Sequence, residues 1–154
     1  MITAEDMVME KKHEIITVSP DTTIYEAIKL MNKNNMGSIF IKENDRIVGV
    51  WTERDLLRNS GMKNFNPKTA IIRDYMTKNL ISVKNTHTIY QLIDIFLGRR
   101  LRRLLVEKDG EYIGLLSVGD VMKSCLVEKD KELKSLNEIV SWEYYENWRW
   151  TPKK

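Results

Sequence analysis

The chain has 154 residues, of which 42% are apolar and 31% charged, and its formal net charge is +3. This composition is ordinary for about one soluble globular domain, and the mildly basic charge is compatible with an anionic partner without requiring one. No apolar run approaches the roughly 18 residues of a membrane span, and the acidic N-terminus is unlike a signal peptide, so we expect a cytoplasmic protein with no membrane partner. The single Cys125 excludes an internal disulfide.

The first half of the chain predicts two helices on either side of a β-hairpin. Apolar residues recur at helical spacing after Pro20, with Thr23 and Glu26 as a capping box at the helix start. The predicted elements are an extended piece at 15–18, a helix over 24–31, strands at 38–42 and 46–51, and a helix from about Glu53.

A turn-rich segment at 59–68, which holds Gly61 and Pro67, separates this half from the next. The same order of elements then returns, with Asp109-Gly110 as a strong hairpin signal. The predicted elements are an extended piece at 80–83, a helix over 89–96 with Thr88 and Gln91 as its capping box, strands at 103–107 and 111–116, and a helix from about Val118.

The last predicted helix is longer than its counterpart, because an apolar stripe continues from Val118 to Val140. Three of the four tryptophans then lie within residues 142–150. This aromatic tail has three interpretations: packing on the domain, self-association, or binding of a partner. We favour an interface, because Tyr and Trp are enriched at interfaces.

The chain repeats itself. Residues 16–60 align without a gap on residues 81–125, at an offset of 65 positions. Each copy ends in an apolar strand, a glycine, two apolar residues, a hydroxyl residue, two variable residues and an aspartate, at 47–55 and 112–120. Because a copy of roughly 55 residues buries too little surface on its own, we predict that the two copies pack together around one core.

The sequence therefore predicts an α/β (α+β) fold of two pseudo-symmetric β-α-β-β-α repeats, packed together and followed by an extended helix. The predicted divisions are repeat one at 6–60, a linker at 61–72, repeat two at 73–128, and a helix extension with the aromatic tail at 129–154.

This organisation resembles a tandem pair of cystathionine-β-synthase-type (CBS) domains, or Bateman module, over about residues 6–128. The segments that carry the resemblance are 36–39, 48–57, 101–106 and 114–120. Residues 73–77 resemble the usual start of a copy. Residues 6–9 take the same part in copy one, with two extra residues before Val18. The resemblance implies adenosyl ligands in two clefts between the copies, regulation rather than catalysis, and a flat, disk-like homodimer.

The repeated hydroxyl and carboxylate suit a ribose. A carboxylate can accept hydrogen bonds from both ribose hydroxyls, and a neighbouring hydroxyl can donate or accept. Thr52 with Asp55, and Ser117 with Asp120, meet this requirement at the start of a helix. The same spacing is also that of a helix N-cap box, and the two roles are compatible.

Basic residues near the second hairpin suit a phosphate. Arg99, Arg100, Arg102 and Arg103 lie within five positions. In related modules the residues that match Arg102 and Arg103 face the ligand phosphates, for which a planar guanidinium is well shaped. Copy one has Gly37 and Ser38 there, which allow close approach without adding charge. The alternative is a solvated basic turn.

An adenine needs an apolar slot. The segments that contain Thr17 and Ser82 precede the first helix of each copy and are candidates to line it, with Met36 and Ile39 as further candidates. Each of these residue types also occurs in an ordinary core.

We predict a regulatory module that binds AMP, ADP, ATP or an S-adenosyl compound as a regulatory ligand, controls an unidentified protein, and carries no catalytic cofactor or metal. An enzyme is not indicated, because His13 and His87 stand alone. The alternatives are a nucleic-acid-binding protein, which we do not favour, and a purely structural dimerisation module.

Overall fold

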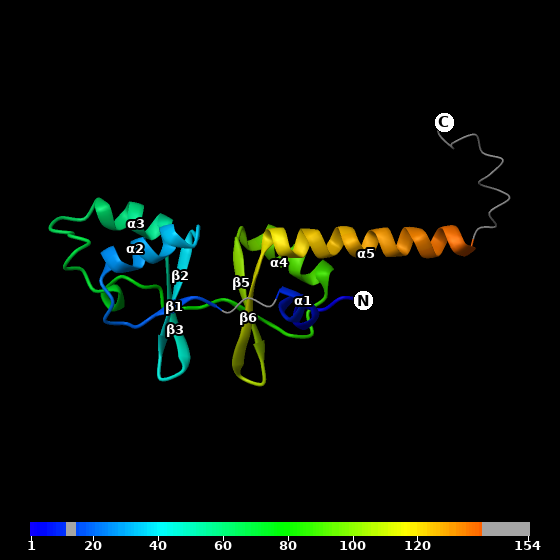
Figure 1. Cartoon of the computed structure of the whole chain (residues 1–154), viewed down its shortest axis with the longest axis horizontal. Helices are drawn as coiled ribbons and strands as arrows, with labels where there is room; N and C mark the ends of the chain where they lie inside the picture. Colours follow the sequence, from blue (N-terminus) through cyan, green and yellow to red (C-terminus); the bar gives the residue numbers. More distant parts are fainter. Residues whose placement is uncertain (12–14, 140–154) are drawn as a thin grey trace, which may run out of the picture.

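The computed structural model describes residues 1–11 and 15–139 and confirms the predicted fold class. Two units, repeat 1 and repeat 2, lie side by side, each with one three-stranded sheet (Figure 1). Repeat 1 contains β1 (Thr17–Val18), α2 (Ile24–Lys33), β2 (Ser38–Glu43), β3 (Arg46–Thr52) and α3 (Glu53–Ser60). Repeat 2 contains β4 (Ser82–Lys84), α4 (Ile89–Arg99), β5 (Arg103–Lys108), β6 (Glu111–Ser117) and α5 (Val118–Ile139). The segments before them form α1 (Ala4–Lys11) and a short 3-10 helix, η1 (Ile72–Asp74).

The two sheets share their strand order and their irregularity. In repeat 1, β1 is parallel to β2, and β2 is antiparallel to β3; β4, β5 and β6 repeat this arrangement. The register of each hairpin shifts once, between Ile41 and Lys42 and, 65 positions later, between Val106 and Glu107. The structural repeat therefore follows the sequence repeat through the hairpins.

The first helix of each repeat begins with the predicted capping box. Thr23 Oγ1 accepts a hydrogen bond from the Glu26 N–H (3.2 Å), and Glu26 Oε2 accepts one from the Thr23 N–H (3.4 Å). Thr88 and Gln91 form the same pair of bonds at α4, at 3.4 and 2.9 Å. These bonds satisfy amide groups that have no partner inside the helix, and they confirm the predicted helix starts.

Each repeat has a hydrophobic core of its own, so the prediction of one shared core is wrong. In repeat 1 the largest fully buried side chain is Trp51, whose Nε1 donates to Asn59 Oδ1 at 2.9 Å. In repeat 2, Leu104 and Leu116 are fully buried in a separate cluster. A repeat this small builds an adequate core because a segment from outside the repeat adds apolar surface to it.

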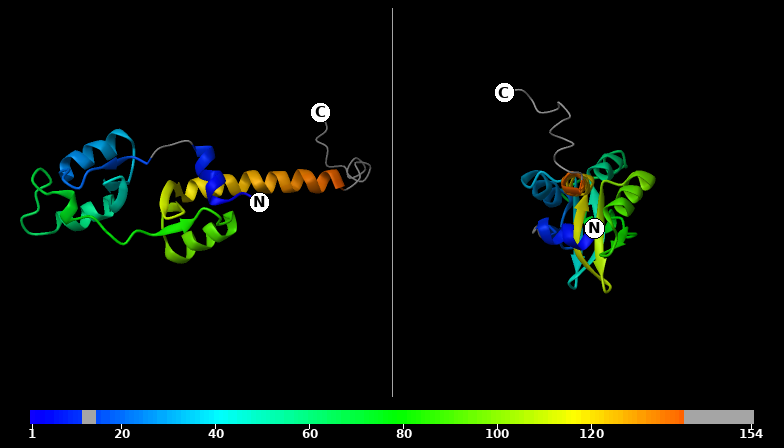
Figure 2. Two further views of the ribbon diagram at one scale, coloured as in Figure 1. Left: turned by 90° about the horizontal axis from the view of Figure 1, so that it is seen from below. Right: turned by 90° about the vertical axis from the view of Figure 1, so that its right-hand side faces the viewer.

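That added segment comes from the stretch of chain before the other repeat. α1 precedes repeat 1, yet its Ala4 and Met7 are buried in the core of repeat 2, beside α5 (Figure 2). Ala70 and Ile72 precede repeat 2 and are buried in the core of repeat 1. The two repeats are therefore joined by exchanged segments as well as by the chain itself.

One glycine in the last strand of each sheet, Gly49 in β3 and Gly114 in β6, makes room for the exchanged segment. A Cβ at Gly114 would overlap the side chain of Val8 in α1, and a Cβ at Gly49 would overlap the side chain of Met76. Val8 thus corresponds to Met76, 68 positions later, whereas the repeats themselves are offset by 65. Three more residues therefore separate Val8 from β1 than separate Met76 from β4, rather than the two that we predicted.

α5 continues beyond repeat 2 as a projecting helix (Figure 1). Its first turns pack on the core, where Val121 is buried and Cys125 is partly buried. Further along, Leu126, Leu133 and Leu136 are each more than half exposed. None of the helices in the described part of the chain is long and apolar enough to cross a membrane. The aromatic tail lies outside the described residues.

Gly114→Ala should destabilise the protein more than Gly49→Ala. The added methyl group at residue 114 meets both Cγ atoms of Val8, which is short and β-branched and has one preferred rotamer on a helix. At residue 49 it meets the flexible thioether of Met76. Overpacking costs about 1–3 kcal/mol, and we expect Gly114→Ala near the upper end of that range and Gly49→Ala near the lower end. Chemical denaturation measures both variants, and equal losses would contradict close packing of α1 on β6.

Candidate functional site

In repeat 1, the predicted hydroxyl and carboxylate lie where β3 meets α3. Asp55 Oδ2 accepts hydrogen bonds from the N–H (2.9 Å) and the Oγ1 hydroxyl (3.0 Å) of Thr52. The Asp55 N–H donates back to Thr52 Oγ1 at 3.2 Å. The pair is therefore a capping box, as the second interpretation of the pattern predicted. Only one carboxylate oxygen is used: the nearest cation to Oδ1 in the described residues is the Arg58 guanidinium, 4.0 Å away.

In repeat 2, the same arrangement has an added cation. Asp120 Oδ2 accepts from the N–H and the Oγ hydroxyl of Ser117, both at 2.7 Å. It also accepts from Lys11 Nζ at 2.8 Å, and this ammonium lies 3.4 Å from the Leu115 carbonyl oxygen. Partial burial alone raises the pKa of Asp120, but the bonds from Lys11 and Ser117 outweigh burial and hold that pKa below its ordinary value.

The hairpin register brings further predicted residues to these junctions. Ser38, the first residue of β2, pairs with Thr52, the last residue of β3. Arg103, the first residue of β5, pairs with Ser117 in the same way. Each repeat therefore ends its hairpin with a side chain beside the capping hydroxyl: a serine in repeat 1 and a guanidinium in repeat 2.

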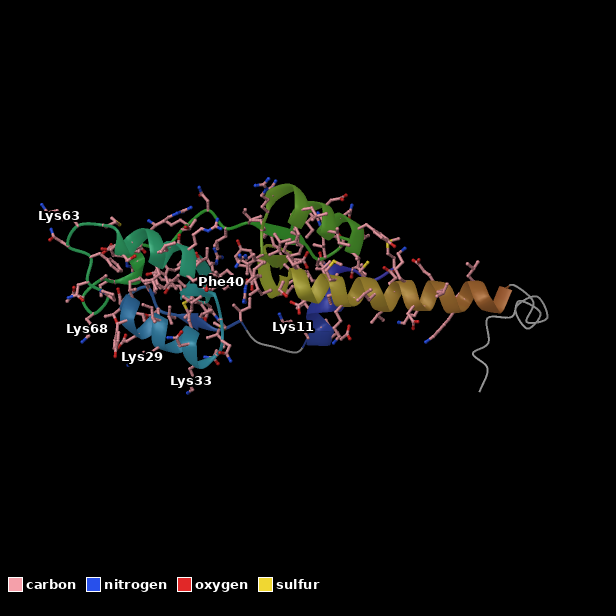
Figure 3. The ribbon with its side chains drawn as sticks, turned by 90° about the horizontal axis from the view of Figure 1, so that it is seen from above. Lys11, Lys29, Lys33, Phe40, Lys63 and Lys68 are labelled. Carbon is pink, nitrogen blue, oxygen red and sulfur yellow. The ribbon has the colours of Figure 1, made fainter. Side chains whose placement is uncertain are left out.

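A cavity of about 450 Å³ lies between the two repeats at this end of the hairpins. Both repeats and α1 contribute to its wall, and Figure 3 shows Lys11 and Phe40 coming from opposite sides of the boundary between the repeats. The cavity brings together three predicted residues, Met36, Ser38 and Arg103. Its wall consists of Lys11, Ile15, Ile16, Asn34, Met36, Ser38, Phe40, Arg103 and Leu115.

One buried hydroxyl group in this wall lacks a hydrogen-bond partner among the described residues. Ser38 is 7% exposed, and its Oγ has no hydrogen-bond partner among the described residues. A buried hydroxyl without a partner costs about 1–3 kcal/mol, so native proteins seldom keep one unless something else binds it. The wall thus combines two cations, apolar side chains and an unsatisfied hydroxyl, with the Asp120 carboxylate beside it. This set can bind a molecule that has an anionic group, an apolar body and hydroxyls.

The other predicted residues lie around or away from this cavity. The Gly37 carbonyl oxygen accepts from the Glu53 N–H at 3.0 Å. The Arg102 guanidinium is 3.6 Å from the Glu53 carboxylate, so it joins the two repeats at the surface. Thr17 lines a second, larger cavity of about 890 Å³ beside the hairpin tips.

Two predicted residues have partners within their own repeat. Ser82 Oγ lies 3.1 Å from Glu107 Oε2 and donates to it. Ile39 is fully buried in the core of repeat 1 and lines neither cavity. Alternate residues of a strand point to opposite faces of the sheet, and Ile39 lies on the face of β2 that packs on α2.

Sequence reasoning did not find Lys11, Asn34 and Phe40 as cavity residues. Lys11 belongs to α1, and only the packing of α1 on the opposite repeat brings its ammonium to Asp120. No local pattern signals this contact, which joins residues 109 positions apart. The repeat pattern could have indicated Leu115, because this residue occupies the apolar position directly after Gly114.

Comparison with known proteins agrees with the repeated fold. The family model described as CBS domain matches residues 4–61 and 72–126. A mitochondrial CBS domain-containing protein of Arabidopsis thaliana, CBSX3, is 31% identical over 129 residues. That match covers 80% of this chain and 63% of the relative, so the chain spans less than two thirds of that protein's length.

Solved structures show the same fold. A CBS-domain protein from Agrobacterium tumefaciens has a TM-score of 0.72 and 30% identity, covering 80% of this chain and 98% of its own. CBSX2, solved in complex with AMP, has a TM-score of 0.69 and 25% identity, covering 84% and 99%. With two family matches, two structural repeats and this likeness, the chain belongs to the CBS domain family and is a tandem CBS pair.

Proposed function

We propose that this chain is a regulatory module that binds an adenosyl ligand between its repeats and carries out no catalysis. The observation that carries the proposal is the buried, unpartnered hydroxyl of Ser38 in the wall of a cavity that also contains Arg103 and Lys11. A serine hydroxyl is redirected by a single rotation about the Cα–Cβ bond, so a ligand in the cavity can satisfy it. The AMP complex of CBSX2 supports an adenine nucleotide as the ligand.

The capping carboxylates fit a ribose without loss of the helix caps. In both repeats the cap uses Oδ2, and no hydrogen bond among the described residues uses Oδ1 of Asp55 or Asp120. A carboxylate has about four lone-pair sites, which leaves Oδ1 able to accept from ribose hydroxyls. In this proposal Thr52 and Ser117 hold the carboxylates in place, and Asp55 and Asp120 bind the sugar.

Arg103 and Arg102 have unequal positions for the proposed phosphate contact. Arg103 lines the cavity and is half-buried, whereas the Arg102 side chain is 84% exposed and lies near Glu53. Charge-assisted hydrogen bonds gain strength as water is excluded. We therefore assign the main phosphate contact to Arg103, and a screened, weaker one to Arg102. Met36 and the other apolar residues of the wall contact the base.

A thermal-shift panel tests the proposal. We expect adenosine, AMP, ADP, ATP or S-adenosylmethionine to raise the melting temperature, and guanosine and GMP to leave it unchanged. A ligand at a hundred times its Kd adds about 2.7 kcal/mol of stability. Ser38→Ala should weaken binding by about twofold to tenfold, through loss of one neutral hydrogen bond, without lowering the stability of the unliganded protein.

The panel also separates the alternatives. No shift with any adenosyl compound indicates a structural module and contradicts the proposal. Equal shifts with adenine and guanine compounds that disappear with added salt indicate a general anion or nucleic-acid surface.

Asp55→Ala and Asp120→Ala should each weaken AMP binding at their own cleft by about 1–3 kcal/mol, or roughly fivefold to over a hundredfold. Because these substitutions also remove a helix cap, the ligand supplies the control. Wild-type protein should prefer AMP to 2′,3′-dideoxy-AMP, and the preference should disappear at the altered cleft. Isothermal titration that shows the same preference in both variants would contradict the ribose roles.

We also propose that two chains pair as a disk-like homodimer. Exposed leucines on three helices support it: Leu57 of α3, Leu97 of α4 and Leu126 of α5 are 75%, 74% and 69% exposed. Exposed apolar side chains on several helices favour burial against a partner. The charged side chains of α5 alternate in sign around Lys129 and Asp130. A second copy of the chain, which carries the same alternation, is therefore an electrostatically complementary partner.

Light scattering should give twice the chain mass of 18.2 kDa. Leu126→Glu should shift the protein towards the monomer, because it places a charge in the apolar contact. Lys131→Glu changes an exposed residue on the same helix that lies about 140° around the axis from Leu126, and it serves as the control. A monomeric wild-type protein, or equal dissociation by both variants, contradicts the pairing.

A further inference from the structure

The Lys11–Asp120 ion pair makes one ligand cleft electrostatically different from the other. Lys11 Nζ lies 2.8 Å from Asp120 Oδ2, and both side chains are 29% exposed. Lys11 also lines the 450 Å³ cavity together with Arg103. Lys11 therefore stands between the proposed sugar-binding carboxylate and the space that a ligand fills.

The corresponding position before repeat 2 has no such cation. The contacts of Val8 with Gly114 and of Met76 with Gly49 set the correspondence of the two exchanged segments at 68 positions. Continued along the chain, this offset places Lys11 at Asn79, which is uncharged, and no ion pair among the described residues joins the adjacent Lys78 to Asp55. The cation nearest to Asp55 among the described residues is Arg58, which belongs to its own helix and is 72% exposed.

This ion pair is partly buried, so water and salt screen it only in part, but a ligand that brings its own hydroxyls or anionic group offers each partner an alternative. A ligand can therefore replace either partner. Lys11, bonded to Oδ2, reduces the negative charge that Oδ1 of Asp120 presents to ribose hydroxyls, whereas a phosphate attracts the ammonium away from the carboxylate and towards itself. The effect of Lys11 on binding thus depends on the charge of the ligand.

We propose that Lys11 is a displaceable counter-ion of Asp120 that selects phosphorylated adenosyl ligands over uncharged ones in this cleft. The inference rests on the proposed function and deepens it. In the empty protein Lys11 neutralises Asp120 and so weakens the acceptor that a neutral nucleoside would use. With a nucleotide bound, Lys11 moves to the phosphate and leaves the carboxylate to the sugar.

Lys11→Met tests the inference by isothermal titration with adenosine and AMP. Adenosine binding should stay unchanged or strengthen, because the charge of Asp120 is no longer neutralised by an ammonium on Oδ2. AMP binding should weaken about tenfold, through loss of one charge-assisted contact. The ratio of the adenosine Kd to the AMP Kd therefore falls about tenfold or more. Lys11→Arg keeps the charge and should keep most of the wild-type ratio.

Lys108→Met is the matched control. Lys108 also joins α1 to repeat 2, through an ion pair with Glu5, but it does not line the cavity. It should loosen α1 without changing the ratio. A ratio that Lys11→Met leaves unchanged, or that Lys108→Met lowers as much, overturns the role of Lys11 while the proposed function stands. A wild-type chain that binds neither ligand overturns the proposed function itself.

Discussion

The close contact between each repeat's glycine and the segment that precedes the other repeat is the constraint on which this molecule depends. Val8 packs on Gly114 and Met76 packs on Gly49, with no room for a Cβ at either glycine. These contacts bury Met7 in one core and Ile72 in the other. To reach these positions the chain has to cross between the repeats, and the crossing places Lys11 and Ile15 in the cavity wall. The cleft is thus built by the exchange, and neither repeat forms it alone.

The capping boxes link the stability of the fold to the proposed binding role. Asp55 and Asp120 each give one oxygen to their own helix start, and this fixes the rotamer of the carboxylate before any ligand arrives. A side chain that is already ordered loses little conformational entropy on binding. A cap and a sugar contact are therefore not competing explanations of these residues, because the cap lowers the cost of the contact.

Local signals predicted the parts of the fold that are local. The capping boxes at Thr23 and Thr88 and both hairpins depend on residues within a few positions of one another, and the 65-residue offset carries them from one repeat to the next. The separate cores and the contact of Lys11 with Asp120 depend on residues far apart in the chain, so periodicity could not show them. Ile39 illustrates the same limit, since the sequence pattern of an apolar strand residue is the same whether its side chain faces a core or a cleft.

The two hairpins share their strand order and register, but the residues around them differ in charge, and this difference bears on regulation. Arg103 stands where repeat 1 has Ser38, and Lys11 stands where the segment before repeat 2 has Asn79. Ser38 and Arg103 line the same cavity, so it is Lys11, paired with Asp120, that makes the electrostatic potential at Asp120 differ from that at Asp55. Under the proposed function, two clefts of unequal charge bind the same nucleotide with unequal affinity. One chain then responds over two ranges of ligand concentration, which two identical clefts could do only through coupling between them.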